Sequence, residues 1–236
     1  MRILALDSSG LVASVAVVEE EQMIAEYTIN YKKTHSQTLL PMLDEIVKMT
    51  QIELDSIDAI AISKGPGSFT GLRIGSATAK GLGLALNKPL IPIKTVEALA
   101  YNLYGTNQII CPMMDARRNQ VYTGLYEFQG EEFHVLKDQE PKSIEEVIEE
   151  LNQIGREVIF IGDGIVPHKT QIEEQLKVPY HFAPAHLCRQ RAGAVGVLAQ
   201  SYYKKGMVET AKDHAPDYLR LSQAEREMQE KLKGKQ

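Results

Sequence analysis

SKGPGSFTGLRIG, residues 63–75, is the stretch that decides the fold of this chain. It follows an apolar run at 57–62 and opens a run of small and aliphatic residues at 72–86, which is the order strand, glycine-rich turn, helix. Gly65 and Gly67 permit unusual backbone angles and a close approach to the main chain. Ser68 and Thr70 are candidate N-caps, and free amides at a helix N-terminus attract phosphate. The glycines alone leave two interpretations open, a phosphate-binding loop or a tight turn without a ligand.

Two common phosphate-binding motifs do not fit this loop. A P-loop needs Gly, four residues and then Gly-Lys-Ser/Thr, but the gap from Gly65 to Gly71 differs and Leu72 stands where Lys would. The dinucleotide fingerprint needs its third glycine one position earlier and an acid about twenty residues further on. Residues 85–88 contain no acid. The loop is therefore compatible with phosphate without matching either motif.

The composition is that of an ordinary globular protein. The 236 residues, 44% of them hydrophobic, suffice for one large or two small domains with a buried core. A net charge of −5 and the absence of Trp argue against a general nucleic-acid surface. Two cysteines predict neither a disulfide framework nor a metal site. The start MRILALDSS resembles a strand rather than a signal peptide, and no apolar run is long enough for a membrane span, so we expect a cytoplasmic protein without membrane association.

The two halves of the chain share one order of elements. Each half has a strand ending in Asp, a turn, two strands, a helix, a strand ending in a glycine turn, and a helix. Strand–helix alternation could recur by chance, but matching landmarks favour a duplication. Two facing units would point their strand ends and helix N-termini into one cleft, where open α/β sheets bind ligands. The landmarks are Asp7, Gly65 and Gly67 in the first half and Asp115, Gly162 and Gly164 in the second.

The pattern predicts an α/β fold of two lobes, each a mixed sheet flanked by helices. The first lobe covers residues 1–105 and the second 106–222, with helix 190–205 free to pack back on the first lobe and a charged tail at 223–236. Thr95 and Ser143 are the expected N-caps of their helices. Predicted strands are 3–6, 13–18, 23–31, 57–62, 89–93, 109–114, 120–128, 132–136 and 158–161. Predicted helices are 36–50, 72–86, 95–104, 143–154, 167–176 and 190–205.

Four segments resemble the TsaB (YeaZ) family: LALDSS, THSQTLLPMLDEI, GPGSFTGLRIG and PDYLR. The resemblance runs from residue 2 to about residue 220, and GPGSFTGLRIG is its specific part. It implies the duplicated fold shared by actin, sugar kinases and Hsp70 (the ASKHA fold). It also implies a non-catalytic subunit of bacterial tRNA N6-threonylcarbamoyladenosine (t6A) synthesis at adenosine 37. Such a subunit pairs with the catalytic subunit TsaD and the ATPase TsaE, forms a homodimer when alone, and meets tRNA through the complex.

The resemblance also predicts that the chain has no catalytic metal. TsaD-like enzymes carry His-x-x-x-His on the helix after the fifth strand, where one turn places both imidazoles on one face. Here that helix reads TVEALAYNLYG, with Glu97 and Tyr101 where such a pair could stand. A lone histidine is more often a cap or a core partner than a ligand. No helical i, i+4 pair occurs among the histidines, which are His35, His134, His168, His181, His186 and His214. We therefore expect neither a metal site nor a catalytic residue.

The cleft between the lobes is the predicted nucleotide site. We expect no cofactor of the chain's own, with ATP bound weakly or at an interface with a partner. The fifth strands and the second glycine loop lack a further acid or amide cluster that would hold ribose and base, although Gly162-Asp163-Gly164 could bind weakly. Asp7 has an alternative role, because Asp after a strand commonly accepts hydrogen bonds from the amides of its own turn. The candidate phosphate-site residues are Asp7, Ser8, Ser9, Gly65, Gly67, Ser68, Asp115, Gly162 and Gly164.

Two helices form the predicted partner interface. Helix 36–50 is apolar over about half its circumference. Helix 72–86 contains several glycines, each of which costs about 1 kcal/mol relative to Ala unless another helix packs close against it. The alternative is that both helices are buried within one domain. The candidate interface residues are Leu39, Leu40, Met42, Leu43, Ile46, Leu72, Gly75, Ala77, Thr78 and Leu82; candidate tRNA contacts, with solvated surface as the alternative, are Lys32, Lys33, Arg117 and Arg118.

Two other functions stay open from the sequence. A stand-alone ATP-dependent small-molecule kinase of the same fold would need cleft acids that act on Mg²⁺. A protease would need a metal-ligand pair or a nucleophile–histidine–acid set, and neither is recognisable in the sequence.

Overall fold

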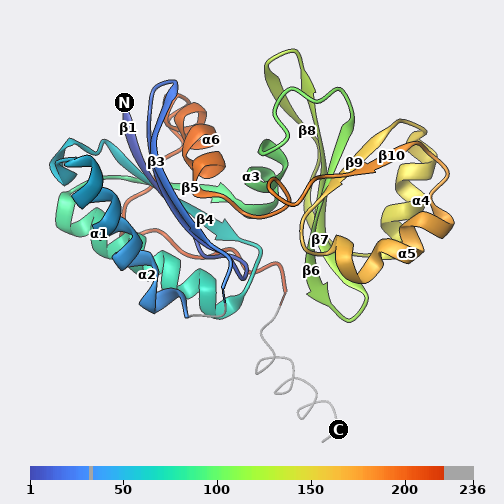
Figure 1. The fold of residues 1–236 in the computed structure, drawn as a ribbon, viewed down its shortest axis with the longest axis horizontal. Coiled ribbons are helices and arrows are strands. Elements are labelled where there is room, and N and C mark those ends of the chain that lie inside the picture. Colours follow the sequence, from blue (N-terminus) through green and yellow to red (C-terminus); the bar gives the residue numbers. More distant parts are fainter. Residues whose placement is uncertain (32–33, 221–236) are drawn as a thin grey trace, which may run out of the picture.

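Two five-stranded mixed sheets form the two lobes of the protein, which lie side by side in Figure 1. The computed structural model describes residues 1–31 and 34–220. The strand orders are β3-β2-β1-β4-β5 and β10-β9-β6-β7-β8. Strands of the first sheet are β1 (Arg2–Asp7), β2 (Ala13–Glu19), β3 (Gln22–Ile29), β4 (Ala59–Gly65) and β5 (Leu90–Lys94). Strands of the second are β6 (Ile109–Arg117), β7 (Gln120–Gln129), β8 (Glu132–Ser143), β9 (Val158–Ile161) and β10 (Tyr180–Phe182).

The central strand β1 shows why the first sheet is covered on both faces. Its successive side chains point to opposite faces, and all of Ile3 to Leu6 are 0% exposed. Leu4 and Leu6 pack under α1 (Leu39–Thr50) and α2 (Phe69–Leu86) in one core cluster. Ile3 and Ala5 pack on the opposite face against α6 (Ala192–Lys204). β1 pairs antiparallel with β2 and parallel with β4.

The second lobe repeats this arrangement around β6. β6 pairs antiparallel with β7 and parallel with β9. One face of the sheet packs under α4 (Ile144–Ile154) and α5 (Ile165–Gln175). The other face packs against α3 (Thr95–Tyr101), a helix from the first half of the chain. α3 and α6 therefore fill the space between the lobes, as Figure 1 shows.

The helix N-termini agree with two of the four predicted N-cap residues, and the candidate Thr70 lies inside α2, which begins at Phe69. Ser68 Oγ accepts a hydrogen bond from the Gly71 amide at 3.3 Å, and Ser143 forms a capping box with Glu146. The prediction for Thr95 is wrong, because Thr95 is the first helical residue of α3 and Lys94 is its N-cap. β5 runs through Lys94 into the helix without a turn, which leaves Thr95 fully buried.

The largest differences from the predicted elements lie at sheet edges. β8 extends to Ser143 rather than to residue 136, and β10 was not predicted. Both are edge strands, where charged residues and Pro141 are tolerated and the apolar alternation is weak. α1 begins at Leu39, after a short 3₁₀ turn at His35–Gln37. The predicted charged tail, Lys32 and Lys33 lie outside the described residues.

The chain after α6 returns to the first lobe, and we call residues 205–220 the strap. The amide and carbonyl of Glu209 pair with those of Leu90 on β5, each bond at 2.9 Å. The Asp217 amide then donates to the Lys64 carbonyl at 2.7 Å. Within the described residues, no helix combines the length and apolar character needed to cross a bilayer.

Candidate functional site

A pocket of about 700 Å³ lies between the two lobes. The β1–β2 turn, the turn before α1 and the first turn of α2 supply its walls from the first lobe, and the end of β6 and Asp163 supply them from the second. Of the candidate phosphate-site residues, Ser9, Gly67, Ser68 and Asp115 line it. The converging ends of β1, β4 and β6 thus place the pocket where the duplicated pattern predicted a cleft.

The glycines at the start of α2 face the chain's own backbone. A Cβ on Gly67 would lie 2.2 Å from the Ser9 carbonyl oxygen, and one on Gly71 would lie 2.1 Å from that of Ser8. The Ser68 amide donates to the Ser9 carbonyl at 2.7 Å. The β1–β2 turn therefore occupies the close approach that these glycines permit, and the tight-turn interpretation accounts for them.

Gly65 has a different role from the one predicted. Its φ of 125° suits glycine, and a Cβ there would lie 2.2 Å from the Asp217 carbonyl oxygen of the strap. Its own carbonyl accepts a hydrogen bond from Gln139 Nε2 of the second lobe at 3.2 Å. Gly65 does not line the pocket. The candidate phosphate contact at Gly65 is therefore wrong, because the strap and Gln139 cover it.

Asp7 and Ser8 are also corrected, because both are buried and bonded inside the first lobe. Asp7 is 1% exposed and accepts hydrogen bonds from the Ser9 amide, from the Ser9 hydroxyl and from the Ser63 hydroxyl at 2.9, 2.7 and 2.5 Å. Burial raises the pKa of Asp7, and the bonds from Ser63 and Ser9 oppose that rise. The Ser8 hydroxyl donates to the Gly71 carbonyl at 2.9 Å. Neither side chain can orient a phosphate in the pocket.

The buried carboxyl group of Asp7 should make the unfolding free energy depend on pH. Comparison with an Asp7→Asn variant isolates this dependence. Because its pKa is raised in the folded state, the stabilisation from protonation is complete below the unfolded pKa of about 3.8 and is lost as pH rises through the folded pKa. The unfolding free energy of the wild type minus that of Asp7→Asn should therefore increase as pH is lowered from neutral. Its slope should not exceed about 1.4 kcal/mol per pH unit, which is the limit for a single titrating group. Urea unfolding of both proteins across this range measures it, and a difference that is flat or falls with decreasing pH contradicts the expectation.

The second lobe contributes two acids to the pocket. Asp115 is exposed, and its Oδ1 accepts from the Arg117 amide at 2.7 Å, while its own amide donates to Asp163 Oδ1 at 3.2 Å. Burial raises the pKa of Asp163, and Arg189, 3.7 Å away, opposes the rise. Asp163 was not among the candidate site residues, although it lies between the two glycines predicted for this loop. The signal was the acid itself in Gly-Asp-Gly.

The predicted phosphate contacts of Gly162 and Gly164 are wrong. The Gly164 amide donates to the Met113 carbonyl at 2.9 Å, and the Gly162 amide donates to Cys188 Sγ at 3.3 Å. A Cβ on Gly162 would lie 2.1 Å from the Met113 carbonyl oxygen. These glycines let the chain pass close to β6, as Gly67 and Gly71 let α2 pass close to the β1–β2 turn.

The strap connects the lobes at the pocket, which gives the PDYLR segment a structural role. Tyr218 stacks on Phe69 of α2 at a ring-centroid distance of 4.5 Å. Arg220 donates to the Ala116 carbonyl of the second lobe at 2.6 Å and lines the pocket. His35, which also lines the pocket, bonds the Gly10 carbonyl through Nε2 at 2.9 Å. Sequence spacing could not indicate these contacts, since they join residues far apart in the chain.

The strap also completes a serine–histidine–acid set that the sequence did not reveal. Ser76 Oγ lies 2.9 Å from His214 Nε2, and His214 Nδ1 bonds the Glu209 carboxylate. Although this is the connectivity of a hydrolase triad, Ser76 is 4% and His214 2% exposed, and neither lines the pocket. The expectation that no such set exists is wrong. Because no substrate carbonyl can reach a buried serine within a helix, the set instead anchors the strap to α2.

The positions where TsaD-like enzymes would carry metal ligands are used here for packing. Glu97 is 5% exposed and accepts a hydrogen bond from the Tyr202 hydroxyl at 2.6 Å, and burial raises its pKa. Tyr101 packs edge-on against Phe133, with ring centroids 5.2 Å apart. In residues 1–31 and 34–220, no three His, Cys, Asp or Glu side chains come together in a group that could hold a metal ion.

Most of the candidate partner-interface residues are in the core of the first lobe. Those buried are Leu39, Met42, Leu43, Ile46, Leu72 and Gly75. Assigning them to a partner is wrong, because their side of α1 and α2 covers the sheet. Thr78 bonds the Ile74 carbonyl, and Leu82 is half-buried against the same core.

The exposed residues of the two helices, which we call the outer face, are open to solvent. Leu40 is 53% exposed and Ala77 is also exposed, so these two predicted residues do lie on a surface. Met49, at 81%, and Leu84, at 70%, were not predicted. A Cβ on Gly81 would meet nothing within 4 Å. Of the candidate tRNA contacts, Arg117 lines the pocket and Arg118 is exposed, both with positive φ.

Comparison with known proteins identifies the family. The family model for TsaD, tRNA N6-adenosine threonylcarbamoyltransferase, matches residues 22–228. The tRNA threonylcarbamoyladenosine biosynthesis protein TsaB of Bacillus subtilis (strain 168) is 33% identical over 227 residues, which cover 95% of this chain and 96% of that protein. The chain belongs to the TsaB family. The predicted resemblance is therefore confirmed.

Solved structures support the TsaB assignment and the predicted fold. A Pseudomonas aeruginosa protein described as similar to peptidase YeaZ has 28% sequence identity and a TM-score of 0.80, covering 93% of this chain and 99% of that chain. Component A of (R)-2-hydroxyglutaryl-CoA dehydratase from Acidaminococcus fermentans has a TM-score of 0.51 at 10% identity, covering 87% and 99%. The latter likeness concerns the fold alone, and it agrees with the ASKHA fold. Ser76, the serine of the Ser76–His214–Glu209 set, is 4% exposed.

Proposed function

We propose that this chain is a non-catalytic subunit that activates a TsaD-like enzyme in t6A formation. The observation that carries the proposal is the similarity to the TsaB protein of Bacillus subtilis over 95% of the chain. A TsaE-like ATPase joins the pair, and tRNA is reached through the complex. The match to the TsaD model supports a partner with the same two-lobed architecture.

The roles of Glu97 and Tyr101 support a subunit without metal chemistry of its own. Both side chains hold α3 against its neighbours, through the Tyr202 hydroxyl and through the aromatic cluster with Phe133. A metal ligand must instead present a free lone pair to the cleft. On α3, the side chains of Glu97 and Tyr101 therefore serve to join the lobes.

The outer face of α1 and α2 supplies the surface for the partner in this proposal. Gly81 weakens α2 by about 1 kcal/mol relative to Ala, yet no described neighbour needs the space. A second helix lying across Ala77 and Gly81 would use that space and cover Leu40 and Leu84. The homodimer that we propose for the isolated chain uses the same face, so the two pairings exclude one another.

ATP binds weakly in the pocket or at the partner interface in the same proposal. The first turn of α2 and Arg220 offer positive groups, while Asp115 and Asp163 oppose an unpaired phosphate. A second candidate, a stand-alone ATP-dependent kinase, is favoured by one observation, the convergence of these two acids at the end of β6. Isothermal titration tests the second candidate, because the kinase requires binding of ATP–Mg²⁺ by the chain alone and an absence of such binding would refute it.

Reconstitution tests the proposed function. The full chain, a TsaD-like enzyme, a TsaE-like ATPase, threonylcarbamoyl-adenylate and tRNA are combined, and t6A is measured by mass spectrometry of digested tRNA. We expect t6A only when both the chain and the enzyme are present. Equal t6A without the chain, or t6A from the chain alone, would refute the proposal.

A further inference from the structure

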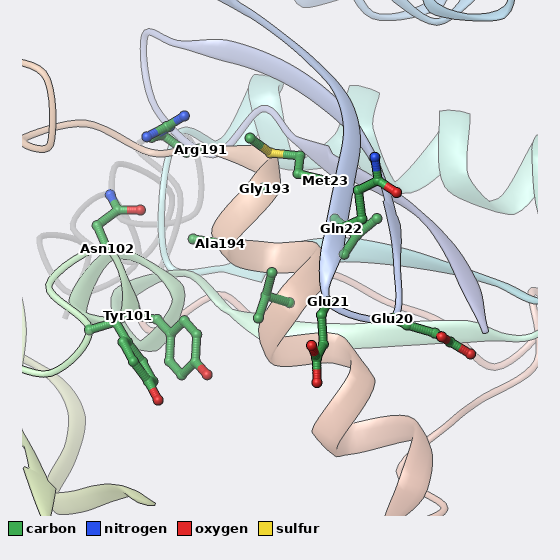
Figure 2. Close-up of a pocket in the computed structure, with 12 residues that line it drawn as sticks. Glu20, Glu21, Gln22, Met23, Tyr101, Asn102, Arg191, Gly193 and Ala194 are labelled. Carbon is green, nitrogen blue, oxygen red and sulfur yellow. The ribbon is translucent and has the colours of Figure 1, made fainter. Parts of the chain in front are cut away.

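A second cavity, of about 660 Å³, lies beside α6 and shares no lining residue with the pocket between the lobes. Figure 2 shows its walls, which come from the β2–β3 turn, from the end of α3 and from the first turns of α6. We call it the α6 groove. It is separate from the outer face of α1 and α2, so it is not explained by the proposed pairing.

The α6 groove carries apolar side chains that the chain itself leaves uncovered. Met23 is 46%, Tyr104 55% and Val197 39% exposed, and all three line the same hollow. Burying such side chains yields about 25 cal/mol per Å² of apolar surface. An occupant of the groove must therefore present apolar groups.

The floor of the groove is fixed by close packing between β3 and α6. A Cβ on Gly193 would lie 2.8 Å from Met23 Sδ and 3.1 Å from Glu26 Oε1. The Gly193 amide donates to Glu26 Oε1 at 2.9 Å. Because these contacts hold α6 and β3 together, the hollow is present before any occupant arrives.

The charge of the groove is negative. Arg191, the only cation among the described residues that line the groove, is ion-paired with Glu26. Glu21 is exposed and has no ion pair within residues 1–31 and 34–220. The Glu20 side chain is 79% exposed and forms an ion pair with the N-terminal amine at 3.8 Å. Two carboxylates beside an apolar hollow repel phosphate and attract a cation.

We propose that the α6 groove docks a segment of a partner protein in which Lys or Arg alternates with apolar side chains. The carboxylates of Glu20 and Glu21 bind the cations. Met23 and Val197 cover the apolar side chains, and the ring of Tyr104 can also receive a cation on its face. Tyr104 packs edge-on against Phe128 of the second lobe at 5.1 Å between centroids, so the occupant contacts a wall that both lobes support.

The test uses the full chain with ¹³C-methyl-labelled methionine and two synthetic peptides as probes. The basic probe is acetyl-Leu-Arg-Leu-Arg-Leu-amide, and the acidic probe has Glu in place of Arg. Met23→Leu assigns the Met23 methyl signal. We expect the basic probe to shift this signal saturably, with a Kd of roughly 1 mM or tighter, and the acidic probe to leave it unchanged.

A matched pair of charge variants separates groove binding from general attraction. Glu21→Lys should weaken the basic probe about tenfold, whereas Glu131→Lys, the same change on the exposed β7–β8 turn, should leave its affinity unchanged. Equal weakening by both variants, equal binding of both peptides, or no shift of Met23 would overturn the proposal. A shift that follows protein concentration without peptide would also overturn it, because a second copy of the chain would then fill the groove.

Discussion

Replacing Gly71 by alanine is expected to lower the unfolding free energy by about 3 kcal/mol. The new Cβ would lie 2.1 Å from the Ser8 carbonyl oxygen and 3.2 Å from His35 Cδ2. The first obstacle is backbone, which cannot swing aside as a flexible side chain can. α2 would have to move away from the β1–β2 turn, which would break the hydrogen bonds from the Ser8 hydroxyl and the Ser68 amide.

Gly81→Ala is the matched control, because it makes the same change on the same helix. Nothing lies within 4 Å of a Cβ at Gly81, so this variant should gain up to about 1 kcal/mol. Urea unfolding of the two variants measures both effects. If Gly71→Ala were as stable as the wild type, the close approach of the two segments would be wrong. If a helix of the partner packs on Gly81, Gly81→Ala should also reduce co-purification with a TsaD-like protein despite its greater stability.

Leu43→Asp and Leu40→Asp should have opposite consequences, although the two residues lie on the same helix. Leu43 is 5% exposed within the core under α1, so an unpaired carboxylate there should cost about 4 kcal/mol or more and prevent folding. Leu40 is 53% exposed, so Leu40→Asp should change stability by less than about 1 kcal/mol. Circular dichroism and thermal unfolding measure this difference.

The proposed role of the outer face also predicts an effect of Leu40→Asp on binding to the partner. Leu40→Asp should weaken co-purification with a TsaD-like protein by about 30-fold or more, because it buries a charge at the centre of a helix–helix contact. Lys169→Asp, at an exposed position of α5 in the second lobe, serves as the control for added negative charge and should bind normally. A folded Leu40→Asp protein that pairs as well as the wild type would remove α1 from the interface.

The duplicated fold could be predicted because its signals are local and occur twice. Each half places an acid at the end of its first strand and glycines at the end of its fourth. The two halves of the one sequence can therefore be compared with each other. Continuous apolar runs identified the buried strands β1, β2 and β4, because helices cover both faces of their sheet. Edge strands such as β8 were predicted less completely, because one side of an edge strand has no neighbour to impose a pattern.

The candidate site was predicted less well than the fold. A glycine shows that something approaches the main chain closely, but it does not show what approaches. At Gly65, Gly67, Gly71 and Gly162, the approaching group is backbone of the same chain rather than a ligand. The apolar width of α1 was equally ambiguous, since the same residues could have covered a sheet or met a partner.

The sequence by itself determined the two-lobed α/β architecture, the helix start at Ser143 and the membership of the TsaB family, because each depends on residues close together in the chain. Only the tertiary structure decided that Asp7 is buried, that Ser76, His214 and Glu209 meet, and which side of α1 is free. These facts depend on contacts between residues that are distant in sequence. Folding creates such contacts by bringing separate segments against one another, and no local spacing records which segments will meet.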